Sequence, residues 1–128
     1  MKARADNLSL MAGPSRLLRA KLSGRLDVRK IAILYGVPLG RFPEILNVSI
    51  AELRRNPDAK VHQARLAYFE QAVQIIPLLK SKNDFGIWAR APNEELKGKA
   101  PVDLLFATPK EAQRLVDAVQ DVVTGQPD

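Results

Sequence analysis

The residues of this chain with the clearest chemical potential are the basic side chains of its first half. Residues 1–60 hold 12 Lys and Arg against five Asp and Glu, a net charge of +7, whereas residues 61–128 hold eight against nine, a net charge of −1. Guanidinium and ammonium groups bind phosphate oxygens, so this asymmetry predicts that the first half meets nucleic acid and the second half meets another partner. The alternative is a basic surface that is only solvated.

No set of residues has the spacing of a catalytic or metal site. The 128 residues include one histidine and no cysteine, which removes disulfides, thiolate ligands and cysteine nucleophiles. There is no phosphate loop, no Gly-rich dinucleotide turn after a strand and no completed Ser/His/Asp set. His62, between Val61 and Gln63, is expected on the surface, and Glu94 and Glu95 fit a solvated turn better than an acid/base pair. We therefore expect no enzymatic activity, no cofactor and no metal.

The elements that must position the basic residues follow an arm, residues 1–12, that shows no periodicity. Pro14 in a first turn and Gly24 as a stop signal predict a helix with an apolar stripe of Leu17, Leu18 and Leu22. Asp27 is expected to cap a second helix that ends at Gly36. Its apolar positions recur at helical spacing: Val28, Ile31, Ala32 and Tyr35.

The segment Leu46-Asn47-Val48-Ser49 predicts the sharp turn of a helix-turn-helix. Asn47 tolerates a left-handed backbone, and Ser49 can cap a recognition helix from Ile50 to Arg55. Pro43 fits the preceding helix only if that helix begins near Phe42. The expected DNA-binding residues are Arg41, Ser49, Ala51, Glu52, Arg54 and Arg55. The alternative is a helical hairpin that only supports the core.

A long helix is predicted next, from Val61 to about Ile76, where Pro77 kinks or ends it. Its broad apolar face must be buried on one side, and part of that face could serve a dimer interface. The face consists of Val61, Ala64, Tyr68, Ala72, Ile75 and Leu79, widened by Phe69, Val73 and Ile76.

The last third predicts three further helices. Trp88, the only tryptophan, lies in a short helical segment and is expected to anchor the core. Pro101 suits the first turn of a helix ending at Phe106, with Leu104 and Leu105 packed inwards. A capping box, Thr108-Pro109-Lys110-Glu111, opens the final helix, which ends at Gly125 after an apolar stripe of Ala112, Leu115, Val116, Val119, Val122 and Val123.

This last third also resembles the toxin-binding domain of the Xre/MbcA/ParS family of antitoxins. The resemblance is carried by Trp88, Pro92-Asn93, Leu96-Lys97-Gly98-Lys99, Pro101-Val102-Asp103-Leu104-Leu105 and Thr108, and it extends from Val48 to Val123. It implies a partner toxin of the RES class that attacks NAD or uses it to modify a target. With the basic first half, it leads us to expect a homodimeric antitoxin that occludes the toxin's active site and represses its own operon by binding operator DNA.

The toxin-binding residues that the resemblance implies are Trp88, Asn93, Leu96, Gly98, Lys99, Pro101, Asp103, Gln126, Pro127 and Asp128. The sequence departs from the family at one turn, where Gly-Gly-Arg-Thr-Pro is common and Lys97-Gly98-Lys99-Ala100-Pro101 stands here. Lys99 keeps the positive charge of arginine but loses its bidentate geometry. The alternative function is a helix-turn-helix regulator without a toxin; a small enzyme is a remote third.

Together these patterns predict an all-α bundle of about six or seven helices, because no segment alternates in the manner of a strand. We expect a flexible arm at residues 1–12, a basic DNA-binding region at 13–58, and a long helix with the toxin-binding domain at 59–128. No apolar segment has the length of a signal peptide or a membrane span, so we expect a cytoplasmic protein without a membrane partner.

Overall fold

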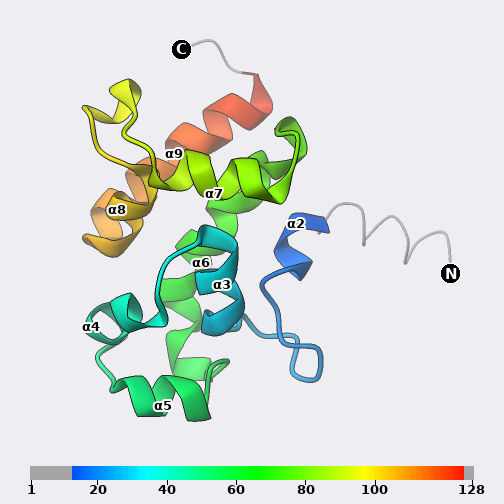
Figure 1. The fold of residues 1–128 in the computed structure, drawn as a ribbon, viewed down its shortest axis with the longest axis vertical. Helices are drawn as coiled ribbons and strands as arrows, with labels where there is room; N and C mark the ends of the chain where they lie inside the picture. The colour runs from blue at the N-terminus through cyan, green and yellow to red at the C-terminus, as the bar shows by residue number, and fades with distance from the viewer. Residues whose placement is uncertain (1–12, 126–128) are drawn as a thin grey trace, which may run out of the picture.

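Helices and turns, without any β-strand, make up residues 13–125, the part of the chain that the computed structural model describes (Figure 1). The α-helices are α2 (Gly13–Arg16), α3 (Val28–Tyr35), α4 (Phe42–Leu46), α5 (Ile50–Arg55), α6 (Gln63–Ala72), α7 (Lys82–Arg90), α8 (Pro101–Phe106) and α9 (Pro109–Thr124). The 3₁₀ helices are η1 (Leu39–Arg41), η2 (Lys60–His62), η3 (Val73–Leu78) and η4 (Glu94–Leu96). Seven of these α-helices have five or more residues, so the predicted all-α bundle is confirmed.

The helix-turn-helix-like segment and the C-terminal helices lie at opposite ends of the long axis. Figure 1 shows α4 and α5 at the lower end, α7 and α9 at the upper end, and α3 with α6 between them. A single cluster of buried side chains joins the two ends and includes Leu53, Phe69, Leu105 and Leu115. None of the described helices has the length and apolar character needed to span a bilayer.

Helix α3 begins and ends where its capping residues predict. The Asp27 carboxylate accepts hydrogen bonds from the backbone N–H groups of Arg29 and Lys30, at 2.8 and 3.4 Å. Gly36 ends the helix in the left-handed conformation, with φ 71°. Arg90 of α7 completes this end, because its guanidinium donates to the carbonyl oxygens of Tyr35 and Gly36, each at 3.2 Å. Helices α3 and α7 are therefore joined through the last carbonyls of α3.

Helix α6 is shorter than the predicted long helix, because the chain tightens into 3₁₀ geometry at Val73. The Val73 N–H bonds to the carbonyl of Glu70 rather than to that of Phe69, its partner in a regular α-helix. The buried Tyr35 hydroxyl donates to the Phe69 carbonyl instead, at 2.6 Å. Burial raises the pKa of Tyr35 well above its usual value, so this hydroxyl keeps its proton.

The predicted helix up to Gly24 is wrong. Helix α2 ends at Arg16, and the chain then turns, with the Ala20 N–H donating to the Arg25 carbonyl at 2.8 Å. Leu18 is buried, but Leu22 lies at the tip of the turn and is fully exposed. Three apolar residues are compatible with either a helix or a turn. The turn forms because the residues that flank it, Leu18 and Leu26, are both buried in the core.

The predicted apolar face of the long helix is partly wrong. Val61 is 80% exposed, and Ala64 is exposed too. The predicted Phe69, Ala72, Val73 and Ile75 are buried. The buried face also contains two residues outside the prediction, Leu66 and His62, and His62 is only 2% exposed. The expectation that His62 lies on the surface is therefore corrected. Its Nε2 atom is buried and has no hydrogen-bond partner among residues 13–125. Burial lowers the pKa of His62, and the Glu52 carboxylate opposes this shift.

The last two helices follow the predicted pattern closely. Leu104 and Leu105 of α8 are buried, and Arg65 of α6 donates to the Leu105 carbonyl at 2.7 Å. The Thr108 hydroxyl accepts from the Glu111 N–H at 3.2 Å, which is one half of the predicted capping box; the Glu111 carboxylate pairs with Arg114 instead. The stripe of α9 is buried as far as Val119, while Val122 and Val123 are exposed.

Candidate functional site

The first candidate site is the unit formed by α4, the turn and α5. Helix α4 begins at Phe42, so Pro43 falls in its first turn, where no backbone N–H is needed. Asn47 adopts the left-handed conformation, with φ 57° and ψ 45°. Ser49 then caps α5, because its hydroxyl accepts from the Glu52 N–H at 3.1 Å. The local geometry that the sequence predicts for a helix-turn-helix is present, although both helices are short.

Helix α5 buries Leu53 and exposes its arginines. Ala51, Arg54 and Arg55 are exposed, and Leu53 is completely buried. The Glu52 carboxylate accepts hydrogen bonds from Asn56 Nδ2, at 2.8 Å, and from the Arg55 guanidinium. These bonds, with that of Asn56 the larger effect, lower the pKa of Glu52. Arg55 is therefore partly neutralised by its neighbour in the helix.

Arg41 contacts two residues of the C-terminal half. Its guanidinium lies 4.2 Å above the Phe106 ring and 3.5 Å from the Asp103 carboxylate. The structure thus joins Arg41, a predicted DNA-binding residue, to Asp103, which the resemblance assigns to the toxin-binding set. Sequence reasoning did not predict this pairing, because the two residues are 62 positions apart.

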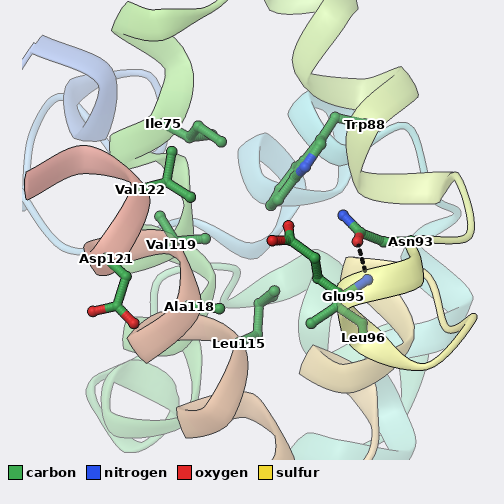
Figure 2. Close-up of a pocket in the computed structure, with 10 residues that line it drawn as sticks. All are labelled: Ile75, Trp88, Asn93, Glu95, Leu96, Leu115, Ala118, Val119, Asp121 and Val122. Atoms are coloured by element: carbon green, nitrogen blue, oxygen red, sulfur yellow. Dashed lines mark hydrogen bonds between the residues drawn. The ribbon is translucent and has the colours of Figure 1, made fainter. Parts of the chain in front are cut away.

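The second candidate site is a pocket of about 470 Å³ between η3, α7, η4 and α9 (Figure 2). Three of the residues that the resemblance implies, Trp88, Asn93 and Leu96, line it. Its other lining residues are Ile75, Glu95, Leu115, Ala118, Val119, Asp121 and Val122. The volume falls within the range of about 300–1,000 Å³ that is typical of small-ligand clefts.

Local turn chemistry shapes the rim of this pocket. The Asn93 side chain accepts from the Glu95 N–H at 2.8 Å and so caps η4. The chain then reverses through Lys97 and Gly98, both with positive φ, and the Asn93 N–H donates to the Lys99 carbonyl at 3.1 Å. This closed loop fixes the Glu95 backbone at the pocket's edge.

Trp88 is only half-buried, so it is both a packing residue and part of a surface. Its ring packs against Phe85 at a centroid distance of 5.6 Å, and its other side borders the pocket. The prediction of a core anchor therefore describes only one side of the ring.

The remaining predicted toxin-binding residues are dispersed. Gly98 and Lys99 are exposed on the loop that follows η4, whereas Pro101 is buried at the start of α8 and offers little surface to a partner. Asp103 is exposed but faces Arg41. Gln126, Pro127 and Asp128 lie outside the described residues.

The acidic side chains of the pocket are the functional candidates that sequence reasoning missed. The sequence predicts a solvated turn for Glu95 and assigns no role to Asp121. Neither is ion-paired with any described residue. The sequence contains no signal for their meeting, because η4 and the end of α9 come together only in the folded chain.

No group of three or more His, Asp or Glu side chains suited to a metal ion occurs among residues 13–125. The chain matches no protein-family model, no curated protein and no solved structure. Any functional assignment therefore depends on the two candidate sites and on the resemblance found in the sequence.

Proposed function

We propose that this protein is the antitoxin of a toxin–antitoxin pair: its C-terminal half occludes the active site of an NAD-directed RES-domain toxin, and its basic half binds operator DNA. The observation that carries the proposal is the clustering of Trp88, Asn93 and Leu96 around one pocket. These residues belong to the block that resembles Xre/MbcA/ParS antitoxins. A concave, mostly apolar surface with a few polar groups is the usual form of a binding site.

The DNA-binding half of the proposal is supported by the α4–turn–α5 geometry and by the exposed Arg54 and Arg55. A six-residue recognition helix makes few contacts by itself, so we propose that two copies bind together to adjacent half-sites. Light scattering at micromolar concentration tests this step. A protein that remains monomeric there would contradict cooperative binding by a preformed dimer.

The decisive experiment pairs the chain with the product of the adjacent reading frame. We expect the neighbour to be toxic alone, to consume NAD in a cell-free assay, and to copurify with this chain when both are expressed. Consumption of NAD should cease when the chain is added in equimolar amount. An adjacent product that is harmless or fails to copurify would contradict the antitoxin assignment.

The second candidate function is a helix-turn-helix regulator without a toxin, and the first candidate site is the observation that favours it. It predicts specific binding to the DNA upstream of its own gene whether or not a toxin exists. A gel-shift titration with that DNA, together with the copurification experiment, distinguishes the two functions.

A further inference from the structure

The pocket beside Trp88 combines one aromatic wall, an apolar floor and a carboxylate, and it carries no positive charge. Ile75, Leu115, Val119 and Val122 supply the apolar surface. Figure 2 shows the Glu95 carboxylate directed towards the space beneath the Trp88 ring, whereas the Asp121 carboxylate points away at the opposite edge. On a chain of net charge +6, this is a locally acidic concavity.

From this arrangement we infer that the pocket binds an arginine side chain presented by a partner protein. This inference rests on the proposed function only for the identity of the partner, which would be the toxin. The binding chemistry itself depends on the pocket alone.

Three features of the pocket fit arginine. The planar guanidinium stacks on a tryptophan face, which is the strongest aromatic partner for a cation. Glu95 can accept two parallel N–H bonds from the same guanidinium, which orients it. The aliphatic stem of arginine covers apolar surface while its charged end stays at the rim, which matches a floor of Val119 and Leu115 below an acidic edge.

The carboxylate that a guanidinium needs is not engaged within the described part of the chain. No ion pair there involves Glu95. No Lys or Arg is among the residues that line this pocket. A partner's arginine therefore does not have to displace a cation of this chain from the described lining. Charge complementarity therefore favours a basic partner over an acidic or neutral one.

The test uses the single tryptophan as its reporter. The full-length chain is titrated with the capped tripeptide acetyl-Ala-Arg-Ala-amide, while Trp88 emission and the one indole N–H resonance are followed. We expect a saturable change with a millimolar dissociation constant. The same tripeptide with citrulline, which has arginine's shape without its charge, should bind at least tenfold more weakly.

Two matched variants locate the effect. Glu95→Gln should weaken binding of the arginine tripeptide about tenfold, whereas Glu94→Gln, one residue away and outside the pocket lining, should change it less than twofold. Both variants remove one negative charge from exposed positions of η4, so their melting temperatures should match that of the parent. Equal binding of the citrulline tripeptide, or equal weakening by the two variants, would overturn the inference.

The outcome is distinguishable from that of the proposed function. If the adjacent product proves not to be a toxin, the tripeptide should still bind to the pocket. If the toxin is genuine but Glu95→Gln leaves both the tripeptide affinity and the complex unchanged, the pocket inference fails and the antitoxin assignment stands.

Discussion

Asp103 of α8 and Arg41 of η1 form an ion pair, with 3.5 Å between a guanidinium nitrogen and a carboxylate oxygen. The same guanidinium lies above the Phe106 ring. The contact joins one residue from each of the two regions that the sequence separates. Arg41 therefore contributes to the junction between the regions as well as to the basic charge of the first.

This junction predicts a structural role for Arg41. Both side chains are partly exposed, so the ion pair and the cation–π contact together should contribute only about 1 kcal/mol. We expect Arg41→Ala to lower the free energy of unfolding by about this amount in urea denaturation, and Asp103→Asn by less. If Arg41→Ala instead leaves stability unchanged and abolishes DNA binding, Arg41 acts chiefly at the DNA.

DNA binding should depend on Arg54 more than on Arg55, because Arg55 is already paired with Glu52. We expect Arg54→Ala to weaken operator binding strongly and to reduce the slope of log K against log salt by about 0.9, the value for one lost phosphate contact. Replacement of both arginines should weaken it further. An affinity that is unchanged in the double variant would remove α5 from the interface.

Glu52→Gln provides the converse test at the same helix. The change removes a negative charge near the proposed phosphate contacts and frees Arg55, so binding in a gel-shift titration should tighten. Because the pKa of Glu52 is lowered, the carboxylate is ionised throughout the neutral range, and the effect should not vary between about pH 6 and pH 8. A weaker complex would indicate that Glu52 itself accepts a bond from a base.

Stability should fall on mild acidification because of His62. Its pKa is lower in the folded chain than the value of about 6.5 in an unfolded chain, so the unfolded state binds a proton more readily. The contribution of neutral His62 to the free energy of unfolding is complete above about pH 6.5, and it is lost as the pH falls through the pKa of His62 in the folded chain. Urea denaturation between about pH 7 and pH 5 measures the loss, because His62 is the only histidine.

The matched variant for this prediction is His62→Gln, which should flatten the pH dependence in that window. The NMR titration of the single imidazole gives the pKa directly and does not require the variant to fold. A pKa at or above about 6.5 in the folded protein would contradict the prediction.

Gly36 and Gly24 allow backbone strain to be separated from a steric clash. Both have positive φ, so alanine is strained at each position, but only at Gly36 would a Cβ meet another atom, 1.5 Å from Arg90 Nη1. We expect Gly24→Ala to cost about 1 kcal/mol and Gly36→Ala clearly more, because Arg90 must also leave the end of α3. Thermal denaturation gives the comparison. Equal costs would show that Arg90 moves without penalty.

The extreme C-terminus provides a test of the occlusion mechanism. Deletion of residues 126–128 should leave the melting temperature and DNA binding nearly unchanged, because Gly125 already ends the last helix. Protection against NAD consumption by the toxin should decrease, and a bulky C-terminal tag should act in the same direction. If the truncated chain still inhibits fully, neutralisation comes from the surface between Trp88 and Leu105 or from locking the toxin's conformation.

The sequence by itself determined the features that depend on a few neighbouring residues. Asp27 and Gly36 fix the ends of α3, and Asn47 with Ser49 fixes the turn before α5. Each is a hydrogen bond or a backbone conformation within one turn of the chain, so the residue type predicts it directly. The all-α class follows from the same local signals, summed over the chain.

Only the tertiary structure decided which faces are buried and which distant side chains meet. His62 is buried and Val61 is exposed, the reverse of what the spacing of apolar residues predicts, because the packing of η2 in the folded chain sets which side faces the core. The Tyr35 hydroxyl reaches the Phe69 carbonyl because α3 and α6, which are distant in sequence, pack together. Glu95 and Trp88 border one pocket for the same reason: non-local packing energy, which no short segment encodes, brings their elements together.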